Sequence, residues 1–145
     1  MIVLKSFRLH LLILLAPGIN ACSGLVAGPV SSSVTAIPAS RDSAYVRARR
    51  ALQAESFTLD KIDSTHGVLT GTRWPISSAK QGSSAACHVA LVMNIKGSGE
   101  AAEVTSTSRW IAPEGMNEQA PKVCEQERSQ VLERTAQVLV PPATP

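Results

Sequence analysis

The most constraining feature of the sequence is a pair of segments with strict two-residue alternation, joined by a short loop. One face of the first segment carries Cys87, Val89, Leu91, Met93 and Ile95. One face of the second carries Ala102, Val104, Ser106, Ser108 and Trp110. This period is typical of β-strands, because successive side chains point to opposite faces. Since only residues 96–100 separate the segments, we expect an antiparallel hairpin with one face against a core.

Two more strands and two helices are expected around this hairpin. The expected order is helix, four strands, helix, over residues 41–55, 57–62, 68–74, 87–95, 101–110 and 121–139. Ser40 or Asp42 can cap the first helix, and Pro121 suits the first turn of the second. The connections between strands are too short for parallel crossovers. The sequence therefore predicts an α+β domain, a four-stranded antiparallel sheet with both helices packed on one face.

The N-terminus has the pattern of an export signal. Lys5 and Arg8 precede an apolar run over residues 11–15, which Pro17 and Gly18 then interrupt. The run is shorter than the roughly 20 residues that a membrane-spanning helix needs. An exported protein meets an oxidising compartment, where disulfides persist.

The end of this segment, Ile19-Asn20-Ala21-Cys22, resembles the lipobox of bacterial lipoproteins, with Ile19 and Asn20 as less common residues at their positions. The resemblance implies that a signal peptide of residues 1–21 is removed and that Cys22 carries lipid, palmitate among the acyl chains. Ser23 is similar to the outer-membrane sorting signal of that family, which implies an anchor at the periplasmic side of the cell outer membrane. The alternative is an ordinary secreted protein cut after Ala21.

Residues 22–40 are expected to be the lipidated cysteine and a flexible tether. The segment after Cys22 has no charge and is rich in Ser, Ala, Gly, Val and Pro. As a coil it would span roughly 20–25 Å and hold the domain at the membrane without contact between protein and lipid. Residues 41–140 then form a single domain, and residues 141–145 are expected to be a disordered tail.

Cysteine count supports a disulfide bond. If Cys22 is lipidated, two of the three cysteines remain, Cys87 and Cys124, and both lie on apolar faces of their expected elements. A bridge between them would stabilise a small domain by roughly 3–4 kcal/mol. The alternative is two unpaired, buried thiols.

No cofactor, metal site or catalytic centre is expected. The chain after Cys22 has two histidines, His66 and His88, and no pair of cysteines at metal-binding spacing. Cys87 and His88 are neighbours in a strand, so their side chains point to opposite faces. The formal charge of +3 falls to +1 when Lys5 and Arg8 are removed, which is no footprint for nucleic acid.

The best candidate for binding a partner consists of Arg73, Trp74, Arg109 and Trp110. Each tryptophan ends a strand beside an arginine, and these residue types dominate interface hot spots. The alternative is that both tryptophans close one end of the core. We expect a membrane-anchored envelope lipoprotein that acts as a binding or scaffold module in outer-membrane or secretion-system assembly. The alternatives are a small envelope hydrolase and an inhibitor.

Overall fold

The structure is a computed structural model that describes residues 24–74, 87–114 and 120–140. The elements of the described part are, in order, β1 (Leu25–Ala27), β2 (Ser31–Ile37), α1 (Arg41–Ala54), β3 (Thr58–Asp63), β4 (Val68–Arg73), β5 (His88–Ser98), β6 (Ala101–Pro113) and α2 (Ala120–Leu139). The signal segment 1–21, Cys22 and the tail 141–145 lie outside the described residues, so what the sequence predicts for them stays a prediction.

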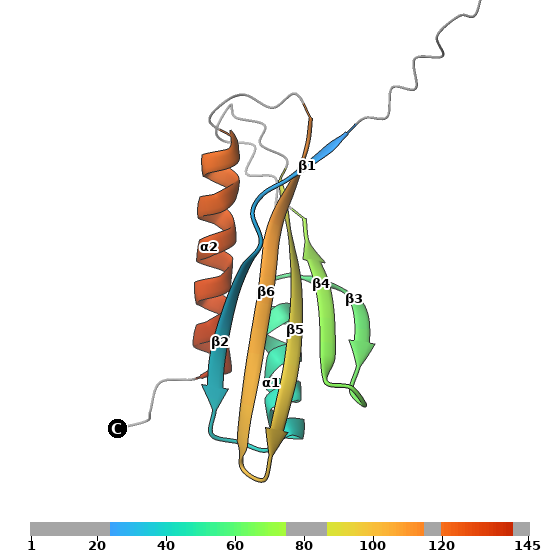
Figure 1. Cartoon of the computed structure of the whole chain (residues 1–145), viewed down its shortest axis with the longest axis vertical. Helices are drawn as coiled ribbons and strands as arrows, with labels where there is room; N and C mark the ends of the chain where they lie inside the picture. The colour runs from blue at the N-terminus through green and yellow to red at the C-terminus, as the bar shows by residue number, and fades with distance from the viewer. Residues whose placement is uncertain (1–23, 75–86, 115–119, 141–145) are drawn as a thin grey trace, which may run out of the picture.

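The strands form one antiparallel sheet, and the α+β class predicted from the sequence is confirmed (Figure 1). The strand order is β1-β6-β5-β4-β3, and β2 pairs with β6 further along the same strand. The long β5–β6 hairpin predicted from alternation is the centre of the sheet. The sheet has six strands, so the prediction of four was wrong: it missed β1 and β2.

Both missed strands lie in the segment predicted as a tether, and that prediction was wrong for residues 25–37. Leu25–Ala27 pairs with residues 111–113, and Ser31–Ile37 pairs with residues 102–108. A strand along the edge of β6 satisfies backbone groups without needing apolar side chains, and Ile37 is the buried residue of β2. Gly28 and Pro29 mark the break between the two strands, where composition alone indicated a linker.

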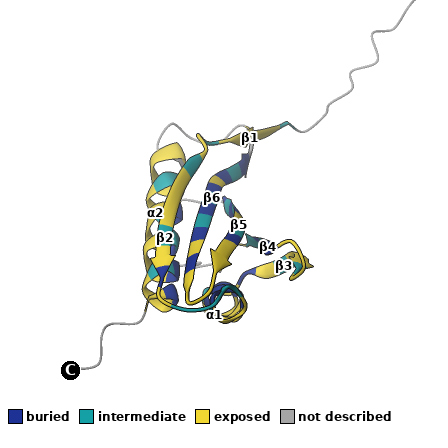
Figure 2. Ribbon diagram, turned by 60° about the horizontal axis from the view of Figure 1, so that its bottom comes forward, coloured by how far each residue is buried: buried dark blue, intermediate teal, exposed yellow. Residues whose placement is uncertain are grey.

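The core lies between one face of the sheet and both helices. In β5 the buried residues are Val89, Leu91, Met93 and Ile95, as alternation predicted. Leu52 of α1 and Val131 of α2 belong to the same buried cluster as Leu91 and Val104, so both helices cover one face. The alternation of buried with more exposed positions is visible along β6 in Figure 2. The other face of β6, with Glu103, Thr105, Thr107 and Arg109, is exposed or half-buried.

Helix α1 is defined by local hydrogen bonds at both ends. Ser40 is its N-cap, and the hydroxyl oxygen accepts from the backbone N–H of Ser43 at 3.3 Å. At the other end, the N–H groups of Ser56 and Phe57 donate to the carbonyls of Gln53 and Leu52. This is the Schellman pattern, and Ser56 occupies its left-handed position with φ of 60° where glycine is usual.

Candidate functional site

The structure separates the four residues predicted to bind a partner into two pairs on opposite faces of the sheet. Arg73 and Trp110 both lie opposite Val89 and point to the core side, where Trp110 is only 5% exposed. Trp74 is 61% exposed, and Arg109 is also exposed, on the outer face. The prediction that these four residues form a single site was therefore wrong, because neighbouring residues in a strand point to opposite faces.

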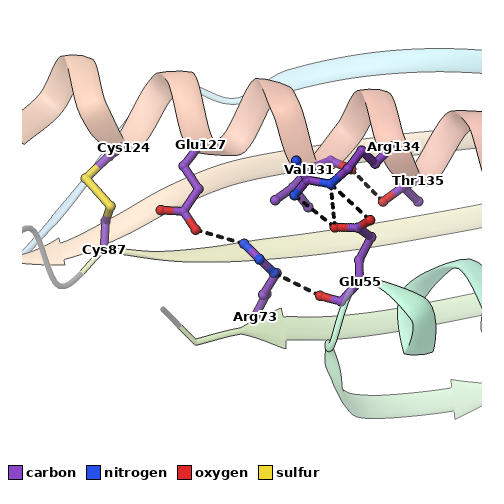
Figure 3. Close-up of polar contacts among 8 residues, drawn as sticks. All are labelled: Glu55, Arg73, Cys87, Cys124, Glu127, Val131, Arg134 and Thr135. Atoms are coloured by element: carbon purple, nitrogen blue, oxygen red, sulfur yellow. Dashed lines mark hydrogen bonds and ion pairs between the residues drawn. A yellow bond between two sulfur atoms is a disulfide. The ribbon is translucent and has the colours of Figure 1, made fainter. Parts of the chain in front are cut away.

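Arg73 is part of an ion-pair network that fixes α2 to the rest of the fold (Figure 3). Its Nη1 lies 2.8 Å from a carboxylate oxygen of Glu127, and its Nε donates to the carbonyl of Glu55 at 2.8 Å. The Glu55 carboxylate accepts from Nε of Arg134 at 3.0 and 3.1 Å. Because Arg73 is occupied between β4, α1 and α2, its role is structural rather than partner binding.

The predicted disulfide between Cys87 and Cys124 is confirmed. Its Cα atoms are 5.8 Å apart, and the bond joins the start of β5 to the first turns of α2 (Figure 3). Both residues are buried beside Trp110 and Ala112. An oxidised pair has no thiolate, so Cys87 cannot act as a nucleophile in this state.

His88 lies on the outer face, away from the disulfide. Its ring stacks on Trp74 with the ring centroids 4.7 Å apart. Partial burial lowers the pKa of His88, which favours the neutral ring. The pair covers the end of the sheet where β4 and β5 meet.

A buried arginine that sequence reasoning missed lies on the core side of α2. Arg128 is 5% exposed, and its guanidinium makes a two-pronged ion pair with Glu125 while Nη1 donates to the Ser108 hydroxyl at 3.1 Å. Hydrogen bonds from Arg128 are the main reason that the pKa of Glu125 is lowered. Charged residues of an amphipathic helix usually face solvent, so the amphipathic pattern offered no reason to expect Arg128 in the core.

Two signals could have revealed this arrangement. Arg128 follows Cys124 by four residues and precedes Val131 by three, so all three lie on one face of the helix. Ser106 and Ser108 occupy inward positions of β6 and are buried. Hydroxyls in the core register of a strand indicate a polar group on the element packed above them, since buried polar atoms need partners.

A groove adjoins this cluster, between the N-terminal half of α2 and the segment that links β1 to β2. Its volume is about 500 Å³, and it is lined by Pro29, Trp110, Pro121, Lys122, Glu125, Gln126 and Ser129. Trp110 packs so closely beneath the backbone of Gly28 that a Cβ there would lie 2.1 Å from the indole nitrogen. The chain is held in this position by a hydrogen bond from the Gly28 N–H to the Trp110 carbonyl, at 2.9 Å.

The indole N–H of Trp110 has no hydrogen-bond acceptor in good geometry among the described residues, although it is buried. It lies close enough to the Glu125 carboxylate to help lower the pKa of that carboxyl, after the larger effect of Arg128. A buried donor without an acceptor costs about 1–3 kcal/mol, so native proteins rarely leave one unexplained. The indole nitrogen is covered by the backbone of Gly28, so a ligand in the groove would meet the ring of Trp110 rather than its N–H.

Among the remaining titratable side chains of the described residues, Asp63 and His66 are placed by local contacts. The described residues contain no group of three or more His, Cys, Asp or Glu side chains placed to hold a metal ion. His66 and Asp63 are close, but the Asp63 carboxylate accepts from the His66 backbone N–H at 3.0 Å and shapes the β3–β4 turn. This backbone hydrogen bond is the largest cause of the lowered pKa of Asp63. Within the described part of the chain, no helix is both long and apolar enough to span a membrane.

Comparisons with known proteins give no family for the chain. No family model matches it, and no curated protein matches it. Among solved structures, the chain is similar to Ara h 8.0201, with 6% identity, a TM-score of 0.49, and coverage of 80% of this chain and 98% of that one. It is also similar to TTHA0849 from Thermus thermophilus, with 11% identity, a TM-score of 0.39, and coverage of 80% and 100%. At these values neither likeness bears on function, which has to be argued from the residues themselves.

Proposed function

We propose that the protein is a lipid-anchored lipoprotein of the bacterial envelope whose domain binds a partner protein in the groove over Trp110. The anchor is the lipid on Cys22, at the periplasmic side of the outer membrane, and the domain acts as a binding or scaffold module in envelope or secretion-system assembly. The lipobox-like residues 19–22 support the anchor. The buried disulfide supports an oxidising compartment.

The observation that carries the binding role is the groove itself, where apolar residues surround Trp110 and polar residues form the rim. Pro29 and Pro121 offer apolar surface next to the ring, and Lys122 and Gln126 supply donors at the rim. An extended peptide fits this chemistry, because its backbone carbonyls can accept from Lys122 and Gln126 while its side chains pack on apolar surface. The proposed partner is therefore an extended segment of another envelope protein.

A photo-crosslinking amino acid tests the groove in living cells. Placed at Gln126 on the groove rim, it should give a discrete adduct that mass spectrometry identifies. Gln137 is a matched control, since it is an exposed glutamine on the same helix, 11 residues further along. Adducts that are absent at Gln126, or identical from both positions, would show that the groove does not bind the partner.

Two substitutions test the groove against the outer face of the sheet. Gln126→Ala removes a polar group at the groove rim and should weaken capture roughly two- to tenfold, the value of one hydrogen bond. Arg109→Ala changes the outer face and should leave capture unchanged. If Arg109→Ala lowers capture and Gln126→Ala does not, the partner binds the outer face instead. Thermal melts of both variants separate lost binding from lost folding.

The anchor has its own test. Cys22→Ser should give a protein that stays unprocessed or partitions into the aqueous phase of a detergent, whereas the wild-type protein partitions with the detergent. A variant that is processed normally and still partitions with the detergent would refute lipidation of Cys22.

A further inference from the structure

The fold begins so close to Cys22 that hardly any tether remains. Residue 24 is already described, its carbonyl accepts from the backbone N–H of Glu114 at 3.0 Å, and β1 starts at Leu25. Three residues of fully extended chain span about 10 Å, against the 20–25 Å expected when the whole segment was taken as a coil. If Cys22 carries lipid, β1 must therefore lie within about 10 Å of the membrane surface.

The end of the sheet nearest this point is identified by its strand register. Ala27 of β1 pairs with Ile111 of β6, Ile111 pairs with His88 of β5, and His88 stacks on Trp74. These four residues form one row across the sheet, at the end where β1 enters it (Figure 1).

Large apolar side chains are exposed at this end. Leu25 is 67% exposed, Trp74 is 61% exposed and Val26 is 44% exposed. Tryptophan is enriched where membrane meets water, because the indole is apolar along most of its body and polar at its N–H. The stack on His88 holds the Trp74 ring at the sheet end.

The charges at this end are compatible with shallow contact only. Arg109 and Lys122 are cations there, suited to anionic headgroups, whereas Glu114 beside Gly24 is an exposed carboxylate. A carboxylate is costly in hydrocarbon, so the surface would stay at headgroup depth rather than insert.

We infer that Leu25, Val26 and Trp74 form a membrane-contacting end of the domain, which rests on the phospholipid layer that holds the Cys22 lipid. This inference rests on the proposed lipidation of Cys22 and fixes the orientation that lipidation alone leaves open. The groove over Trp110 then lies next to the membrane, because Gly28 and Pro29 directly follow β1. The tip of the β5–β6 hairpin, at Gly99, points away from it.

Fluorescence of the lipidated protein in vesicles of phosphatidylethanolamine and phosphatidylglycerol tests the contact. Brominated acyl chains quench tryptophans that reach the membrane interface. Quenching should be clear for the wild-type protein and lost in Trp74→Phe, because Trp110 is buried in the domain. Emission of Trp74 should also shift to shorter wavelength relative to the lipid-free Cys22→Ser protein. The lipid-free protein should bind these vesicles little, since a few apolar side chains without an acyl anchor give weak binding.

A matched control places the reporter at the opposite end of the sheet. Ser98 is exposed at the hairpin tip, and Ser98→Trp in the Trp74→Phe background should show no quenching. Vesicle flotation, measured in parallel, reports anchoring separately. Protein that fails to float refutes the lipid anchor and the inference with it. Protein that floats with Trp74 unquenched, or with both reporters quenched equally, refutes the membrane-contacting end and leaves the lipoprotein proposal standing.

Discussion

The ion pair between Arg128 and Glu125 should respond very unequally to removal of its two partners. The Arg128 side chain is 6% exposed, whereas the Glu125 side chain is 40% exposed. Glu125→Ala leaves a buried guanidinium with the Ser108 hydroxyl as its main remaining partner. Breaking a fully buried pair costs about 3–5 kcal/mol; because water can reach the vacated Glu125 position, we expect about 2–3 kcal/mol.

Arg128→Met should cost much less. Methionine keeps the apolar stem, removes the buried charge, and leaves Glu125 free to turn toward water, so we expect about 0–1 kcal/mol. The double variant should match Arg128→Met within about 0.5 kcal/mol, because Glu125 has little to stabilise once the arginine is absent. Urea unfolding followed by circular dichroism, with the disulfide intact, gives these free energies. An Arg128→Met variant less stable than Glu125→Ala would refute the reasoning.

The same pair predicts a pH dependence. Arg128 holds the pKa of Glu125 in the folded protein below its ordinary value of 4.5. A lowered folded pKa gives stability that is present above the unfolded pKa and is lost as pH falls through the folded one. The gap in unfolding free energy between wild type and Glu125→Ala should therefore narrow below about pH 4.5. Gln130→Ala, an exposed and uncharged position on the same helix, is the matched control and should show no such narrowing.

Three further substitutions test individual features. Replacing both Cys87 and Cys124 by alanine should lower the unfolding free energy by roughly 3–4 kcal/mol, and a thermal melt unchanged by the double substitution would contradict this. Gly28→Ala would place a Cβ against Trp110 and should destabilise the domain by about 1–3 kcal/mol with a changed tryptophan emission; unchanged emission would argue against the contact. Ser56→Gly should stabilise the domain by about 1 kcal/mol in urea, because it relieves a left-handed φ of 60° at a helix end; a loss of stability would show that the serine is not strained.

Local periodicity and cysteine count were enough to predict the centre of the fold. The alternation over residues 87–95 and 101–110 became the β5–β6 hairpin, which extends to residues 98 and 113. The segment 121–139 became α2, which starts one residue earlier. These features are visible in a sequence because side chains repeat with period two in strands and near four in helices. The pairing of Cys87 with Cys124 followed from parity and from both lying on apolar faces.

Both the strand pattern in the sequence and the tertiary structure were needed to define the candidate binding site. Strand alternation by itself would have separated Arg73 from Trp74 and Arg109 from Trp110, since each pair is adjacent in sequence. What no local pattern shows is which surface the packed elements leave open. The groove exists because α2 and the segment between β1 and β2 come together at Trp110.

The sequence by itself determined the α+β class, the central hairpin, both helices and the disulfide, because each leaves a trace in neighbouring residues. Tertiary structure alone decided that residues 25–27 and 31–37 are strands rather than tether. Their pairing partners lie more than 60 residues away, and the bonds that order them join backbone groups common to every residue. An uncharged run rich in serine, alanine and valine has the same composition whether it is a free linker or the edge of a sheet. Pairing with the hydrogen-bonding edge of β6 makes this segment the edge of a sheet.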